Sequence, residues 1–153
     1  MARPKNPVAF LKTDDRKYGV EQSLRTLKIN PVKGKDVLIK PNFNTADHTP
    51  GSTHNDTLVA LVEAMWDRGA RSVTVGERSY PSTLEVMEKK GILPLMERLG
   101  ARVLNFDDLP ARDWVAFRGR NGYWTNGFRI ARPILDAECL VSTCCLKTHQ
   151  FGG

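Results

Sequence analysis

The chain has 153 residues, of which 41% are hydrophobic and 26% are charged, and its net charge is +6. This composition is ordinary for a folded globular protein and excludes a wholly disordered chain, while the positive charge favours anionic partners in general. No apolar run is long enough for a signal peptide or a membrane span, and an odd count of three cysteines is a poor framework for disulfides. We therefore expect a cytoplasmic protein with no membrane partner.

Apolar runs and helical spacing alternate along the first part of the chain. Residues 8–11 form a short apolar run that predicts a strand, and Val20, Leu24 and Leu27 recur at helical spacing. The continuous apolar run at residues 37–39 predicts a strand that is buried on both faces.

Capping signals define the elements that follow. Thr53 and Asp56 have the spacing of a capping box at the start of a helix, and Gly69 follows where that helix should end. The same kinds of signal predict a strand at 72–76, a helix from Ser82 to Gly91, a short helix from Pro94 to Gly100, and a strand at 102–106.

The pattern changes after residue 110. Asn121-Gly122 and Asn126-Gly127 are turn signals between two apolar segments, so we expect an antiparallel hairpin inserted near 113–132. Residues 139–142 then resemble a return to a core strand. Strands alternating with helices predict a single α/β domain over residues 1–153, with a largely parallel sheet flanked by helices in βαβ units.

Polar side chains follow three of the predicted strands, at the edge where open α/β sheets bind their ligands. Lys40 and Asn42 follow the strand at 37–39, and Glu77 follows the strand at 72–76. Lys147 and Thr148 follow the last strand. The lysines would neutralise an anion, Asn42 and Thr148 would donate hydrogen bonds, and Glu77 would act as a base.

The loop between residues 42 and 55 adds further candidates. It leads into a predicted helix whose N-terminus favours an anion, so Ser52 and Thr53 would bind a phosphate or carboxylate there. The alternative is that both residues serve only the helix cap, which we favour for Thr53.

Histidines and cysteines occur in the same loops. His54, His149 and Cys145 would ligate a metal ion, and the two histidines would also transfer protons. Their spacing matches no known ligand motif, so the alternatives are hydrogen-bonded surface histidines and buried thiols. Walker, G-x-G-x-x-G, G-x-S-x-G and C-x-x-C motifs are all absent, which removes support for the commonest nucleotide, esterase and thiol-redox functions.

The predicted hairpin combines arginines with aromatic residues, as basic grooves that bind single-stranded nucleic acid do. The alternative, which we favour, is that its aromatic side chains cover the sheet or a partner segment, since no nucleic-acid fold signature accompanies them. The residues concerned are Arg118, Arg120, Arg129, Arg132, Tyr123, Trp124 and Phe128.

Several segments, taken in order, resemble the domain-of-unknown-function family 362. They are Val37 to Asn42 with its Lys-Pro-Asn ending, Ser52-Thr53-His54, Gly69-Ala70 leading to Val73 to Glu77, and Leu146-Lys147-Thr148-His149. The resemblance runs from about residue 8 to residue 153, and the Lys-Pro-Asn and Lys-Thr-His segments are its most specific parts.

The resemblance implies more than the residues themselves do. Members of this family are often fused to a ferredoxin-like domain with two four-cysteine blocks, which implies a redox or metal-linked role and an iron–sulfur cluster on a missing or partner domain. They also continue beyond the Lys-Thr-His segment, so we expect that this sequence is truncated at its C-terminus.

Three hypotheses follow. The first is an enzyme domain that binds a small anionic ligand or a metal cofactor at the carboxyl edge of the sheet, with Lys147, His149 and Glu77 as catalytic residues. The second is a non-catalytic module that docks a partner or an electron-transfer domain. The third is nucleic-acid binding through the basic hairpin.

Overall fold

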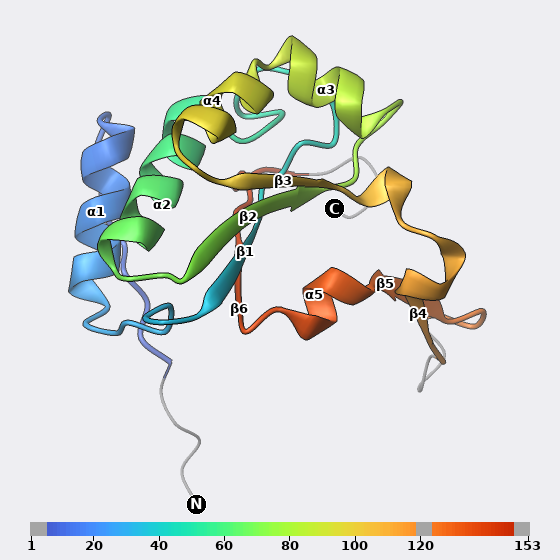
Figure 1. Cartoon of the computed structure of the whole chain (residues 1–153). Coiled ribbons are helices and arrows are strands. Elements are labelled where there is room, and N and C mark those ends of the chain that lie inside the picture. Colours follow the sequence, from blue (N-terminus) through green and yellow to red (C-terminus); the bar gives the residue numbers. More distant parts are fainter. Residues whose placement is uncertain (1–5, 119–123, 149–153) are drawn as a thin grey trace, which may run out of the picture.

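Four parallel strands form the central sheet of the protein. The computed structural model describes residues 6–118 and 124–148. The sheet has the order β3-β2-β1-β6, and all three neighbouring pairs are parallel (Figure 1). The prediction of an α/β fold with a largely parallel sheet is confirmed. Its strands are β1 (Asp36–Lys40), β2 (Ser72–Glu77), β3 (Arg102–Asn105) and β6 (Cys139–Ser142).

Four helices cover one face of this sheet (Figure 1). The apolar side chains of β1 and β2 that point to this face, such as Ile39 and Val75, are completely buried against them. Val37, Leu38 and Ile39 of β1 are all buried, which is why this strand is a continuous apolar run in the sequence, whereas Ser72 and Thr74 of β2 are half-buried and alternate with apolar residues. The helices are α1 (Arg16–Thr26), α2 (Asn55–Asp67), α3 (Thr83–Lys89) and α4 (Ile92–Arg98).

The other face has a thinner cover. Leu38 of β1 packs there against Phe106 and Ala131, which are both buried. The predicted antiparallel hairpin is confirmed, whereas the short helix that follows it, which begins at Arg132, was not predicted. This cover consists of the 3₁₀ turns η1 (Phe106–Asp108) and η2 (Ala111–Asp113), the hairpin strands β4 (Trp114–Phe117) and β5 (Phe128–Ala131), and helix α5 (Arg132–Asp136).

One predicted strand is wrong. Residues 8–11 form no strand, and Val8 and Phe10 have 88% and 93% of their surface exposed. A run of four apolar residues carries no periodicity that separates a strand from an extended segment, and this run pairs with none of the four strands of the sheet.

The N-cap of α3 and the glycines that follow α2, α3 and α4 agree with the sequence signals. Ser82 is the N-cap of α3, where its side chain accepts a hydrogen bond from the backbone N–H of Glu85. Gly69, Gly91 and Gly100 all have positive φ angles just after α2, α3 and α4. None of the helices in residues 6–118 and 124–148 is long and apolar enough to cross a membrane.

A cluster of charged side chains joins the amino ends of three strands. Arg71 donates hydrogen bonds to both carboxylate oxygens of Asp36, at 3.0 and 2.6 Å, and also binds Glu138. Glu138 in turn accepts a hydrogen bond from the backbone N–H of Asp36. Hydrogen bonds from Arg71 and then from Ser72 lower the pKa of Asp36 from 3.8 to about 2.

The lowered pKa of Asp36 predicts a specific acid sensitivity. Because its pKa is lower in the folded protein than in the unfolded chain, the carboxylate stabilises the fold above pH 4, and this contribution disappears as the pH falls towards 2. We expect the difference in unfolding free energy between wild type and Asp36→Asn to shrink between pH 5 and pH 2.5. Urea unfolding at both pH values measures it, and a difference that stays constant would contradict the assignment.

Candidate ligand-binding crevice at the carboxyl edge

The strand order creates a crevice between β1 and β6. The chain adds β2 and β3 on one side of β1 and then returns to add β6 on its other side. In open α/β sheets, ligands bind outside the carboxyl ends of the two strands where the order reverses in this way. Here those ends are the segments that follow Lys40 and Ser142.

A cavity of about 280 Å³ lies at this position. Its walls come from the loop after β1 and from the segment after β6, which are far apart in the sequence. Three of the residues predicted for the site, Asn42, Cys145 and Lys147, line it together. We call this cavity the β1–β6 crevice, and its lining is Asn42, Asn44, Thr45, Asp47, Gly51, Cys144, Cys145 and Lys147.

Thr53 joins the two walls of the crevice. Its hydroxyl accepts a hydrogen bond from the backbone N–H of Asn42 at 2.9 Å and lies 3.0 Å from the hydroxyl of Thr143. Only 3% of its surface is exposed. Thr53 is therefore not the cap of α2, and the predicted Thr53–Asp56 capping box is wrong because this hydroxyl turns inward to the strand ends.

His54 is the N-cap of α2 instead. Its Nδ1 accepts a hydrogen bond from the backbone N–H of Asp56 at 3.1 Å, so the neutral ring carries its proton on Nε2. The ring borders a second cavity of about 350 Å³ together with His48, Lys89 and Lys90. Histidine is an unusual cap, and nothing in the sequence distinguished it from the neighbouring threonine.

Ser52 is also occupied by the protein itself. It is completely buried, and its hydroxyl donates a hydrogen bond to the carbonyl oxygen of Thr45 at 2.7 Å. Thr49 donates a further hydrogen bond to the carbonyl oxygen of Ser52. These bonds fix the loop that forms one wall of the crevice.

Glu77 and Lys40 form an ion pair beside the crevice. Lys40 Nζ lies 2.6 Å from Glu77 Oε1, and the Glu77 side chain is 2% exposed. The backbone N–H groups of Phe43 and Arg78 also donate to this carboxylate, at 3.0 and 2.8 Å. To act as a base, Glu77 would have to give up one of these hydrogen bonds. Lys40 was predicted to neutralise an anionic ligand, but its charge is already paired with Glu77.

Lys147 supplies positive charge in the crevice, and Lys90, which lines the cavity beside His54, supplies a second positive charge near Asp47 and Cys145. Lys147 is exposed, and its Nζ donates a hydrogen bond to the carbonyl oxygen of Gly51 at 2.9 Å.

The Lys90 ammonium lies 5.0 Å from the centre of the Phe43 ring. Burial lowers the pKa of Lys90, while the nearby Asp47 and Cys145 oppose that change. Lys90 was not predicted, because it follows α3 and carries no motif.

Cys145 and Cys144 bring two thiols to the crevice. All three cysteines are free; Cys144 is exposed, whereas Cys145 and Cys139 are half-buried. Within residues 6–118 and 124–148, no three His, Cys, Asp or Glu side chains come close enough to hold a metal ion. His149, the third predicted metal ligand and a predicted catalytic residue, lies outside the described residues, and Thr148 is exposed at the border.

The hairpin places its aromatic residues on each other. The rings of Phe117 and Phe128 are stacked with their centres 5.4 Å apart, and Trp124 packs edge-on against Phe128. The ring faces that would stack on nucleic-acid bases are thus partly used within the hairpin. Arg120 and Tyr123, which belong to the predicted basic surface, lie outside the described residues.

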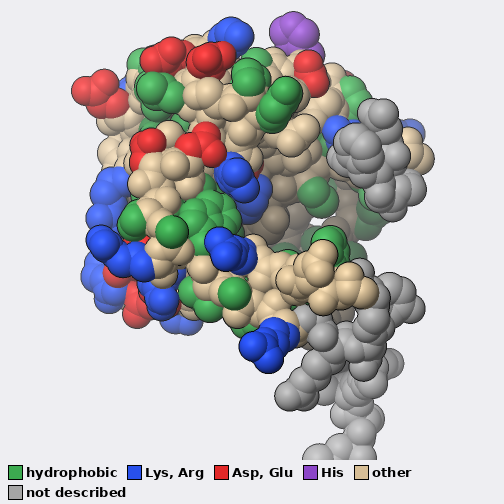
Figure 2. Space-filling model, turned by 90° about the vertical axis from the view of Figure 1, so that its right-hand side faces the viewer, with side chains coloured by type: hydrophobic (Ala, Val, Ile, Leu, Met, Phe, Trp, Pro, Cys, Tyr) green, Lys and Arg blue, Asp and Glu red, His purple; other side chains and the backbone are tan. Residues whose placement is uncertain are grey.

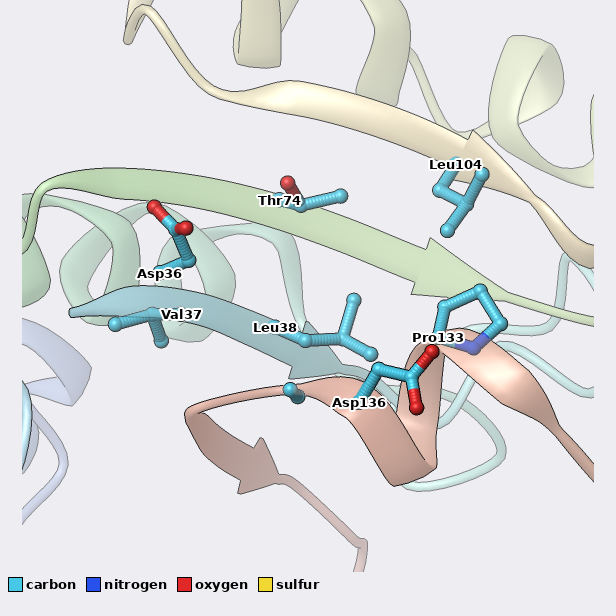
Figure 3. A pocket seen from close by; sticks show the side chains of 8 residues that line it. Asp36, Val37, Leu38, Thr74, Leu104, Pro133 and Asp136 are labelled. Atoms are coloured by element: carbon cyan, nitrogen blue, oxygen red, sulfur yellow. The ribbon is translucent and has the colours of Figure 1, made fainter.

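A third cavity, between the sheet and α5, differs in character (Figure 3). It measures about 170 Å³ and is lined mainly by apolar side chains, among them Leu38, Leu104 and Pro133. Its two carboxylates are Asp36, which is bound to Arg71, and Asp136. With no free cation or nucleophile among these lining residues, the cavity does not compete with the crevice as a catalytic or anion site.

Comparisons with known proteins agree with the order of these segments. Residues 37–153 match the model of the family described as Domain of unknown function (DUF362). Thylakoid-associated protein sll1697 of Synechocystis sp. is 29% identical over 143 residues, which cover 83% of this chain but 40% of that protein. No solved structure matches. The chain therefore belongs to the DUF362 family, and the matched region contains all of β1 except Asp36, together with β6 and both walls of the crevice.

Proposed function

We propose that the protein binds a small anionic ligand in the β1–β6 crevice. A cavity of about 280 Å³ lies at the carboxyl ends of β1 and β6, where the strand order reverses, and this position supports the proposal most strongly. Lys147 and Lys90 provide positive charge, and the side-chain amides of Asn42 and Asn44 provide neutral hydrogen bonds. The carboxylate of Asp47, which also lines the crevice, lowers the net positive charge of the site. The site therefore suits a ligand with one or two negative charges better than a polyanion.

The proposal gives two kinds of role to the predicted site residues. Asn42 and Lys147 line the crevice and would contact the ligand, whereas Thr148 does not line it. Ser52, Thr53, Lys40 and Glu77 position the loops, because their polar atoms bind the protein itself. Cys145 would place a thiol beside the ligand, and a reducing compartment such as the cytoplasm would keep that thiol free. A redox-linked reaction would then involve this sulfur.

Alkylation of Cys145 tests the charge of the crevice directly. Iodoacetate and iodoacetamide react with the same thiolate, but only iodoacetate is an anion. The ratio of the two alkylation rate constants therefore reports the electrostatic potential at Cys145. The fraction of thiolate cancels from this ratio, because it enters both rate constants equally. In a Cys139→Ser/Cys144→Ser background, we expect Lys147→Met or Lys90→Met to lower the iodoacetate-to-iodoacetamide ratio about fivefold, since neighbouring unit charges interact by ~1 kcal/mol or more near a protein surface.

The matched control is Lys33→Met. It removes the same charge from an exposed residue that precedes β1, at the amino edge of the sheet. We expect this variant to leave the rate ratio unchanged, and we expect inorganic phosphate to slow alkylation of Cys145 in the wild type. A ratio insensitive to Lys147 and Lys90, together with no protection by phosphate, would reject the proposed site.

A further inference from the structure

A polar cavity that is distinct from the three described above lies on the opposite face of the sheet from α1–α4. It measures about 420 Å³ and is lined by Arg78, Phe106, Asp107, Trp114 and Arg129. These residues come from three separate segments: the end of β2, the turn η1 and the hairpin. Figure 2 views the molecule from the side on which the hairpin lies in Figure 1 and shows Lys and Arg side chains next to hydrophobic ones there.

The guanidinium of Arg78 is held in place by two contacts. Its Nε lies 3.4 Å from Asp107 Oδ1, and its Cζ lies 5.3 Å from the centre of the Trp114 ring. Asp107 is itself fixed by a hydrogen bond from the backbone N–H of Thr83 at 3.0 Å. Within the described part of the chain, the two terminal nitrogens of Arg78 have no acceptor, so they remain available for a ligand.

Asp107 stays ionised at neutral pH. Burial alone would raise its pKa, but hydrogen bonds from Thr83 and the charge of Arg78 outweigh burial and hold the pKa below the usual value. One carboxylate therefore faces two guanidinium groups in this cavity, and the cavity keeps a net positive charge.

Arg129 provides the second guanidinium. It is an exposed residue of β5, and no carboxylate lies within ion-pair distance of it in residues 6–118 and 124–148. Arg132, three residues later, differs because it contacts Asp113 at 3.6 Å. An arginine without a carboxylate partner, next to a second arginine that is already oriented, is a favourable arrangement for binding a phosphate through both groups.

We propose that this cavity binds a phosphate carried on a flat aromatic group. Arg78 and Arg129 would bind the phosphate oxygens, and the aromatic part would lie against the Trp114 and Phe106 side chains. The volume of 420 Å³ falls in the range of small-molecule sites and exceeds what a single phosphate needs. This site is separate from the β1–β6 crevice and shares none of the residues that line it.

Phenyl phosphate is a probe that matches both parts of the site. We expect it to shift the Trp114 indole N–H signal in NMR titrations and to bind more tightly than inorganic phosphate or phenol alone. Arg129→Gln should weaken its binding at least tenfold, and Arg78→Gln should weaken it to a similar extent. Arg129→Lys should recover only part of the affinity, because lysine keeps the charge but loses the planar pair of donors.

Two controls separate this site from others. Arg112→Gln removes the same charge from an exposed residue of η2 that does not line the cavity, so binding should not change. Lys147→Met, in the crevice, should not change it either. Unchanged affinity in Arg129→Gln, or equal binding of phenol and phenyl phosphate, would overturn the proposal whether or not the crevice binds an anion.

Discussion

Replacing Glu77 with alanine is expected to lower the free energy of unfolding by about 1–3 kcal/mol, the usual cost of leaving a buried hydrogen-bond donor without a partner. The carboxylate is 2% exposed and accepts hydrogen bonds from Lys40 Nζ and from the backbone N–H groups of Phe43 and Arg78. Its loss would leave the Phe43 N–H buried without a partner and would leave the Lys40 ammonium without its counter-charge. Urea unfolding followed by circular dichroism measures the change.

Two comparison variants show whether the buried geometry is the cause. Glu77→Gln keeps an acceptor oxygen for the Phe43 N–H, so we expect it to cost less than Glu77→Ala. Glu63→Ala removes an exposed ion pair with Lys17 and should cost less than about 1 kcal/mol. If Glu77→Ala proved as mild as Glu63→Ala, Glu77 would not be the residue that holds the strand ends together.

Gly76→Ala is expected to destabilise the protein by about 1–3 kcal/mol through overpacking. A Cβ at this position would lie 2.7 Å from two atoms of the Phe106 ring and 3.0 Å from Leu38 Cδ1. Phe106 is buried beneath the hairpin side of the sheet and has little room to move. Thermal unfolding measures the effect as a lower Tm.

Thr74→Val is the matched control for this substitution. Thr74 points to the same face of β2 two residues earlier, where it borders the cavity near α5 (Figure 3). Its hydroxyl makes no hydrogen bond to any described residue, so we expect a change of less than about 1 kcal/mol. Equal effects at positions 74 and 76 would mean that the contact with Phe106 is not the cause.

The sequence was sufficient to predict the strands of the sheet and the hairpin, because these depend on local patterns, whereas the order β3-β2-β1-β6 depends on pairing between distant segments and could not be predicted. β1 contains a continuous apolar run, Val73 and Val75 of β2 alternate with polar residues, and the Asn126-Gly127 pair stands just before β5. The strand at 8–11 failed because four apolar residues also fit an exposed extended segment. The helix α5 is a single short turn with a proline at its start, and five residues show no helical periodicity.

The candidate site was predicted only in outline. The rule that ligands bind at the carboxyl ends of strands selected Asn42 and Lys147, and both line the crevice. The sequence could not show that Lys40 is neutralised by Glu77, since the two residues are 37 positions apart. Lys90 follows α3, and the fold brings its ammonium over the Phe43 ring and near Cys145, which no local motif in the sequence indicates.

Titration of the ¹⁵N-labelled protein with inorganic phosphate shows whether the β1–β6 crevice binds an anion. We expect saturable shifts of the backbone amides of Asn44, Thr45, Gly51 and Cys145, which line the β1–β6 crevice, and weaker binding in Lys147→Met. The Trp114 indole signal reports the arginine cavity separately in the same spectra. Shifts that do not saturate at the crevice amides, or an affinity unchanged by Lys147→Met, would contradict the assignment of the crevice as an anion site.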